Sequence, residues 1–138
     1  MMDSDKPEVI LVDADPILLS MHKRSLEMLL HCQVRIFETG LAAMRHLTAC
    51  GGAKLIIANH QMPDMTGLTL VRTLLFHPRL AGISVMVLTS GGGNKLSSLV
   101  SAGADSVMDK RTSPLQLARE AQRLMLTGRA PVVAAKAI

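Results

Sequence analysis

Several short apolar runs of the sequence are followed at once by polar side chains that could do chemistry. The run VILV is followed by Asp13 and Asp15, and the run LIIA by Asn59. Thr89 follows VMVL, and Lys110 stands just after a fifth, shorter run. Carboxylates and a lysine can bind ions, whereas hydroxyl and amide groups donate and accept hydrogen bonds. If the runs are neighbouring strands of a parallel sheet, these side chains meet where the strands end, and we expect the functional site there.

The apolar runs alternate with segments of helical periodicity, a pattern typical of an α/β domain with a parallel sheet. Strands are predicted at residues 8–12, 33–37, 55–58, 84–88 and 106–108, and helices at about 16–30, 41–48, 68–75, 95–102 and 114–125. Three strands are continuous apolar runs, which indicates that helices cover both faces of the sheet. The strand QVRIF alternates polar and apolar residues and is predicted at an edge. Five alternations without a hairpin signal predict right-handed crossovers and a doubly wound sheet.

The first and last helices begin with the same arrangement of residues. Asp15-Pro16 and Ser113-Pro114 each offer a side-chain oxygen as the N-cap, followed by proline in the first turn. Clear periodicity ends near residue 126. We therefore expect a single domain over residues 1–126 and a tail or linker over residues 127–138.

The composition excludes several classes of protein. Hydrophobic residues make up 49% of the 138 residues, but no apolar run is long enough to span a bilayer. The beginning, MMDSDKPE, does not resemble a secretory signal peptide. Cys32 and Cys50 have no metal-binding or redox spacing, so a reducing, cytoplasmic location is expected.

The net charge of +4 permits an acidic partner, including nucleic acid. However, the basic residues are scattered, and the chain has two Phe, no Tyr and no Trp for stacking on bases. No helix-turn-helix or zinc pattern occurs, so we expect nucleic-acid binding only through a downstream domain, if one follows. The first turn, VDADP, lacks glycine and carries two carboxylates, which disfavours a nucleotide or flavin phosphate there.

Four segments together carry a resemblance to a known family. They are ILVDADP at the first strand, NHQMPDMTG at the third, VMVLTS at the fourth and AGADSVMDK at the fifth. With these segments the chain resembles the receiver domain of bacterial two-component response regulators, from Val9 to about Met125. The resemblance implies a flavodoxin-like (βα)5 fold with strand order 2-1-3-4-5. It also implies a cytoplasmic role in phosphorelay signal transduction, with a histidine kinase or an output protein or domain as the partner.

The family works as a phosphorylation switch. An aspartate after the third strand accepts a phosphoryl group, and it binds Mg²⁺ together with paired acids after the first strand. By the resemblance, Asp13 matches the first acid of that pair. Thr89 and Lys110 match the hydroxyl and the lysine that contact the phosphoryl oxygens.

Other positions depart from the family pattern. Ala14 stands where the second acid belongs, and Asn59 stands at the phosphoacceptor position. Val107 replaces the aromatic residue of the fifth strand that reports the phosphorylated state. Arg111 follows the lysine where the family usually has a proline in a cis peptide, so a cis bond there is disfavoured.

These departures remove charge and chemistry from the pocket. An asparagine oxygen cannot form a stable acyl phosphate, so we expect Asn59 not to be phosphorylated. With Ala14 and Asn59 neutral, Mg²⁺ binding is expected to be weak or absent, Asp13 and Asp15 being weak candidate ligands. We further expect Lys110 to form a salt bridge with Asp13 and a hydrogen bond with the Asn59 side-chain oxygen. The sequence thus predicts no enzyme but a degenerate receiver that acts as a protein-interaction module.

Two interpretations remain as alternatives. A phosphorylatable switch could use Asp15 or Asp64 with Mg²⁺, although the helix cap is the favoured role of Asp15 and solvent exposure that of Asp64. A nucleic-acid-binding regulator is the other alternative. His60 is expected at the surface, and a homodimer is possible through the last two helices and the fifth strand, a region that holds Leu96, Leu99, Leu115 and Ala118.

Overall fold

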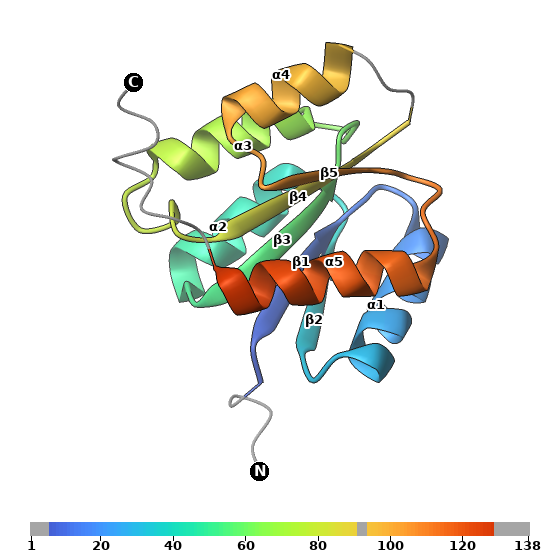
Figure 1. The fold of residues 1–138 in the computed structure, drawn as a ribbon. Coiled ribbons are helices and arrows are strands. Elements are labelled where there is room, and N and C mark those ends of the chain that lie inside the picture. Colours follow the sequence, from blue (N-terminus) through green and yellow to red (C-terminus); the bar gives the residue numbers. More distant parts are fainter. Residues whose placement is uncertain (1–5, 91–93, 129–138) are drawn as a thin grey trace.

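A parallel five-stranded sheet organises the chain, in a computed structural model that describes residues 6–90 and 94–128 (Figure 1). In order along the chain, the elements are β1 (Glu8–Val12), α1 (Pro16–Leu29), β2 (Gln33–Phe37), α2 (Gly40–Cys50), β3 (Ala53–Asn59), α3 (Gly67–Phe76), β4 (Ser84–Thr89), α4 (Asn94–Ala102), β5 (Ser106–Asp109) and α5 (Pro114–Thr127). The strand order is β2-β1-β3-β4-β5, and every neighbouring pair is parallel. The predicted flavodoxin-like, doubly wound fold is confirmed.

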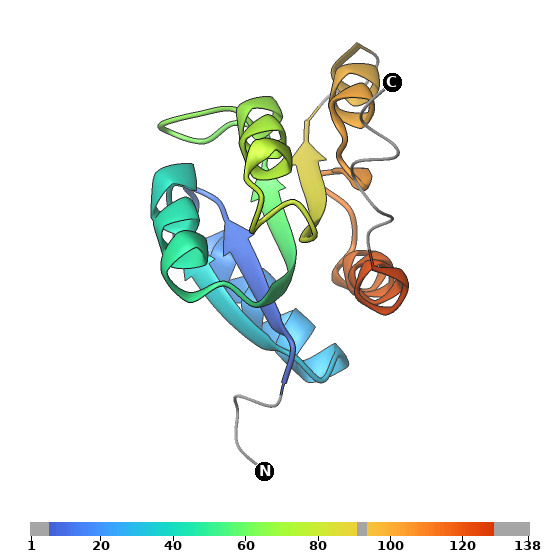
Figure 2. The same cartoon turned by 90° about the vertical axis from the view of Figure 1, so that its left-hand side faces the viewer.

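Helices cover both faces of the sheet, as the continuous apolar strands predicted. Helices α1 and α5 lie on one face, and α2, α3 and α4 lie on the other (Figures 1 and 2). Alternate residues of the central strands therefore enter two separate cores: Ile56 and Val87 pack on the α2–α4 side, and Leu55 and Met86 pack on the α1–α5 side. All four side chains are fully buried, so the sheet that carries the strand ends is held from both sides.

The helix starts are fixed by side-chain caps. Asp15 accepts hydrogen bonds from the amides of Ile17 (2.9 Å) and Leu18 (3.4 Å), and Ser113 accepts one from the amide of Gln116 (3.2 Å). Both predicted caps are confirmed. Thr39 is a further cap, which the sequence did not predict: its Oγ1 accepts a hydrogen bond from the amide of Ala42 (3.1 Å). This cap explains why α2 begins at Gly40 rather than Leu41.

The end of α5 lies slightly beyond the expected domain boundary. The helix continues through Thr127, and Gly128, with a φ of 67°, closes it in the left-handed region that glycine favours. The first residue of the predicted tail is therefore helical, and residues 129–138 lie outside the described residues.

The longest helices, α1 and α5, have 14 residues each. A helix needs about 20 apolar residues to cross a bilayer. Within residues 6–90 and 94–128, no helix has the length and apolar character for a membrane crossing.

Candidate functional site

The polar residues predicted to meet do lie at one edge of the sheet. Strand pairing places Val12 beside Ala58, Asn59 beside Leu88, and Thr89 beside Asp109, so the residues that end these strands are neighbours. Asp13, Asn59 and Thr89 are all buried, Asn59 with only 7% of its surface exposed. We call this place the carboxyl edge, because the carboxyl ends of β1, β3, β4 and β5 form it.

Asp13 is held by the backbone around it. Its own amide donates to the carbonyl oxygen of Phe37 (3.1 Å), which extends the pairing of β1 with β2. Its Oδ1 atom accepts a hydrogen bond from the amide of Asp15 (3.1 Å). The carboxylate therefore braces the turn that leads into α1, and Ala14 between these acids is exposed to solvent.

Asn59 ends β3 with its side chain tied to the following turn. Its Nδ2 atom donates to the carbonyl oxygen of Gln61 (2.9 Å). The next amide, that of His60, donates to Leu88 in β4 (2.7 Å), and the amide of Gly67 donates back to His60 (2.7 Å). The amide side chain thus stabilises a closed turn between β3 and α3.

Lys110 does not form the predicted network, and that prediction is wrong. The hydrogen bonds and ion pairs among the described residues do not join its ammonium group to Asp13 or to Asn59. The backbone amide of Lys110 donates to the carbonyl oxygen of Thr89 (3.0 Å). Asp13 and Asn59 instead bond to backbone groups two residues away. These local bonds cost less conformational entropy than a bond that immobilises a long lysine side chain.

Thr89 and Arg111 complete the edge. Thr89 Oγ1 donates to the carbonyl oxygen of Ser90 (3.3 Å). Arg111 contacts Asp109 through its amide (2.7 Å), its Nε (3.2 Å) and its Nη2 (3.3 Å), and these bonds lower the pKa of the Asp109 carboxyl. No cis peptide occurs in the described part of the chain, so the bond between Lys110 and Arg111 is trans.

Asp64 has a structural partner that the sequence did not reveal. Its side chain is exposed, as expected, but Oδ1 accepts from the amide of Gly40 (3.1 Å) and Oδ2 from that of Leu41 (2.8 Å). Desolvation opposes ionisation of this carboxyl, but the bonds from Leu41 and Gly40 outweigh it and lower the pKa. Asp64 therefore caps α2 from a distant turn, and local sequence offers no signal for such a contact.

His60, expected at the surface, is only partly exposed. It is half-buried, and its Nδ1 atom is shielded from solvent. Gly67 is packed so closely against it that an added Cβ would lie 3.2 Å from His60 Nδ1 and 2.9 Å from Val87 Cγ1. The start of α3 covers this histidine because glycine leaves room for it.

The region expected to form an interaction surface is partly core. Leu99 and Ala118 are buried, whereas Leu96 and Leu115 remain exposed. Val107 is half-buried and packs against the core on the α2–α4 side. Only part of the predicted patch is therefore available to a partner.

The groups available for chemistry at the carboxyl edge are few. They comprise one buried carboxylate, one amide, one hydroxyl and one half-buried lysine, contributed by Asp13, Asn59, Thr89 and Lys110. Among the described residues, no three or more His, Cys, Asp or Glu side chains are grouped so that they could hold a metal ion. The buried part of this edge therefore supplies hydrogen bonds and a single carboxylate, that of Asp13, while the exposed carboxylates of Asp15 and Asp64 already accept hydrogen bonds from backbone amides.

Comparison with known proteins gives this edge its context. The family model of the response regulator receiver domain matches residues 9–122. The chain belongs to this family. It is therefore a receiver domain of two-component signalling.

Individual relatives agree with that assignment. The chain is 27% identical over 122 residues to a Campylobacter jejuni protein named "Chemotaxis protein CheY homolog", an alignment that covers 88% of this chain and 94% of the relative. A solved receiver domain of a signal transduction histidine kinase from Syntrophus aciditrophicus gives a TM-score of 0.79 at 29% identity, covering 88% and 91% of the two chains. The chemotaxis response regulator CheY4 of Vibrio cholerae gives a TM-score of 0.79 at 22% identity, covering 86% and 98%, and at that identity the likeness concerns the fold alone.

Proposed function

We propose that this receiver domain is degenerate and acts as a phosphorylation-independent protein-interaction module in the cytoplasm, without enzymatic activity. The observation that carries the proposal is the neutral side chain of Asn59, buried at the end of β3 and tied to Gln61. The family pattern places its phosphoacceptor aspartate at this position.

The chemistry of the amide supports this proposal. Phosphoryl transfer needs an oxygen nucleophile that can carry the new bond. An amide oxygen carries no full negative charge and is a weaker nucleophile than a carboxylate oxygen, and a stable acyl phosphate would require the loss of ammonia. The hydrogen bond from Asn59 Nδ2 to Gln61 also fixes the amide as part of the turn.

The donor set does not fit the Mg²⁺ that the family uses. Mg²⁺ prefers hard anionic oxygens and gives up its waters reluctantly. At this edge Asp13 is the buried carboxylate, and one of its oxygens already accepts from Asp15. Ala14 presents an exposed methyl group where the family has a second acid. We therefore expect Mg²⁺ to bind weakly or not at all, and no step of the proposed function involves it.

The output side of the switch is altered as well. Val107 has one stiff side-chain torsion and no aromatic ring to move between buried and exposed positions. With neither acceptor nor reporter, two states of differing affinity for a partner have no evident source. The partner, a histidine kinase or an output protein or domain, would recognise a constant surface that includes Leu96 and Leu115, and a homodimer through α4, β5 and α5 would use the same surface.

The alternative is a receiver that accepts a phosphoryl group on Asp15 or Asp64. Both carboxylates already bond to backbone amides at helix starts, Asp15 at α1 and Asp64 at α2. Phosphorylation of either would break those caps, so the geometry disfavours this alternative.

Intact-mass measurement after incubation with acetyl phosphate and Mg²⁺ tests the proposal. We expect no phosphoryl group on the chain itself, whereas the Ala14→Asp/Asn59→Asp variant serves as the positive control that restores the family's acids. A phosphoryl group on the unsubstituted chain that disappears in Asp13→Ala would contradict the proposal. Its loss in Asp15→Asn or Asp64→Asn would then identify the acceptor.

A further inference from the structure

The net positive charge of the chain comes from one stretch of the sequence that is poor in acidic residues. Residues 39–104 contain one acidic residue, Asp64, and five basic residues, Arg45, Lys54, Arg72, Arg79 and Lys95. Five positive charges and one negative give +4, which equals the net charge of the whole chain. This stretch supplies α2, α3 and α4, the layer on one face of the sheet (Figure 2).

Four of these bases, Arg45, Lys54, Arg72 and Arg79, are exposed and take part in no ion pair among the described residues. Arg35, Arg111 and Arg123 elsewhere in the chain pair with nearby acids. The ion pairs among the described residues include none with Lys54, Arg72 or Arg79, all of which face solvent. An unpaired, exposed base keeps its full capacity to bind a carboxylate from another molecule.

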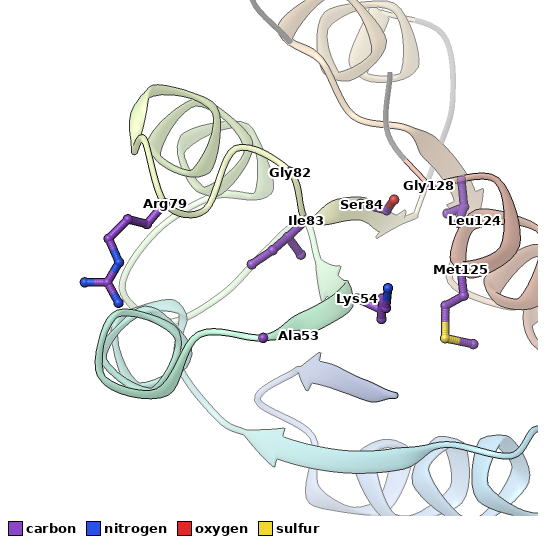
Figure 3. A pocket seen from close by; sticks show the side chains of 10 residues that line it. Ala53, Lys54, Arg79, Gly82, Ile83, Ser84, Leu124, Met125 and Gly128 are labelled. Atoms are coloured by element: carbon purple, nitrogen blue, oxygen red, sulfur yellow. The ribbon is translucent and has the colours of Figure 1, made fainter. Parts of the chain in front are cut away.

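Lys54 and Arg79 border a hollow of about 360 Å³ at the end of the sheet opposite the carboxyl edge, here called the amino edge. Its walls come from the starts of β3 and β4, the loop after α3 and the end of α5, and none of the described residues that line it is acidic. Figure 3 shows Lys54 on the side of Met125, with Ile83 at the centre and Arg79 on the far side. Bases therefore stand at both margins of a hollow whose walls are partly apolar.

A second hollow adjoins the first along the chain. It also has a volume of about 360 Å³ and is lined by Arg72, Thr73, Phe76, His77 and Pro78, the last of which precedes Arg79. Phe76 is 86% exposed. An aromatic ring left this open beside a base offers apolar contact to a partner and costs free energy when it faces water alone.

Another role for Lys54 and Arg79 is to offset the negative ends of nearby helix dipoles. Such an interaction is worth about 0.3–1 kcal/mol at an exposed site. It accounts for bases near α2 and α3, but it does not account for the exposed Phe76 or for the hollows. A partner accounts for all of these features together.

We propose that the two hollows form one docking surface for an acidic segment of a partner protein, a proposal that rests on the interaction-module function above. Carboxylates of the segment pair with Lys54, Arg72 and Arg79, and an apolar side chain packs against Phe76. The two linings meet in the sequence at Pro78 and Arg79, and a polypeptide segment can offer carboxylates and an apolar side chain together, which a flat lipid surface cannot. The ring of Phe76 alone also cannot stack on several successive bases of a nucleic acid.

A fluorescent glutamate-rich peptide with one central leucine is the probe, and fluorescence anisotropy at low salt is the measurement. We expect the Arg72→Glu/Arg79→Glu variant to weaken binding by about tenfold or more, since both charges contact the peptide. The matched control is Arg24→Glu/Arg119→Glu, which changes the net charge equally at exposed bases of α1 and α5 that also join no ion pair among the described residues. It should weaken binding by no more than about threefold, through long-range attraction alone. Phe76→Ala should weaken binding measurably at unchanged charge.

An equal loss of affinity in the two double variants would overturn the proposal, because it would show that the peptide responds only to the net charge of the protein. No binding of the peptide, or clearly tighter binding of single-stranded DNA or of phosphatidylserine vesicles, would overturn it as well. Circular dichroism of each variant checks that the fold is retained. The phosphorylation assay gives an independent result: a phosphorylated chain that still binds the peptide would refute the proposed function alone, whereas an unphosphorylated chain that does not bind would refute the docking surface alone.

Discussion

The two ends of the sheet treat their charged residues in opposite ways. At the carboxyl edge, Asp13, Asp15 and Asp64 each accept hydrogen bonds from backbone amides nearby in space. At the amino edge, Lys54 and Arg79 are exposed, unpaired among the described residues, and placed around a hollow. The first end is satisfied within the chain, while the second offers charge to other molecules. The carboxyl edge is the site of chemistry in the receiver family, but in this chain its carboxylates are already bonded to backbone amides.

The largest effect should follow from restoring acids to the carboxyl edge. Ala14→Asp/Asn59→Asp places two further carboxylates beside Asp13, and we expect their repulsion to lower the free energy of unfolding by about 1–3 kcal/mol without metal. Millimolar Mg²⁺ should then raise the melting temperature of this variant and leave that of the unsubstituted chain unchanged. Thermal melts with Mg²⁺ and with EDTA measure both. An equal Mg²⁺ response of the two proteins would show that the original edge binds the ion.

Two glycines, one near each end, provide the next comparison. An added Cβ at Gly67 would lie 2.9 Å from Val87 Cγ1 and 3.1 Å from the Cα of His60, whereas one at Gly82 would meet nothing within 4 Å. We expect Gly67→Ala to cost about 1–3 kcal/mol of stability through overpacking. Gly82→Ala should be neutral or stabilising by about 0.4–1 kcal/mol, because it restricts the unfolded chain. Urea denaturation of both variants checks this, and a Gly67→Ala protein of unchanged stability would mean that the packing at α3 is loose.

A smaller effect is expected from the long-range cap on α2. Asp64→Ala removes the bonds to the amides of Gly40 and Leu41 and should cost about 1 kcal/mol at neutral pH. Because folding lowers the pKa of this carboxyl, its contribution is present above the ordinary value of 3.8 and is lost as the pH falls through the folded-state pKa. The difference in stability between the two proteins should therefore shrink below about pH 4. A difference that stays constant down to pH 2 would contradict the cap.

The smallest effect should come from Lys110. Since its ammonium joins neither Asp13 nor Asn59, Lys110→Met should change the free energy of unfolding by no more than about 0.5 kcal/mol. Denaturant titration of the two proteins measures the difference. A loss well above 1 kcal/mol would restore the predicted network, and Asp13→Asn should then produce a similar loss.

Much of the fold was readable from the sequence because its signals are local. Continuous apolar runs marked the buried strands, and Asp15-Pro16 and Ser113-Pro114 marked two helix starts correctly. The residues of the carboxyl edge were also found, since each lies at the end of an apolar run of the sequence. Their partners were not. The expected lysine network gave way to backbone bonds two residues away, and the contact of Asp64 with Leu41 spans 23 residues.

The amino edge was missed for a related reason. Lys54, Arg72 and Arg79 lie far enough apart in the sequence to read as scattered charge. The start of β3, the helix α3 and the loop after it bring them to two hollows whose linings meet in the sequence at Pro78 and Arg79. The excess of positive charge over residues 39–104 can be counted from the sequence, but the position of Lys54, Arg72 and Arg79 around the hollows cannot.

The hydrogen bond from the His60 amide to the carbonyl oxygen of Leu88 (2.7 Å) also bears on the deamidation of Asn59. Spontaneous deamidation begins when the amide nitrogen of the next residue attacks the asparagine side chain and closes a succinimide ring. Here that nitrogen is held in the ladder between β3 and β4, turned toward the neighbouring strand. Peptide mass mapping of long-stored protein should find Asn59 intact, so the position would not drift back to an aspartate with time.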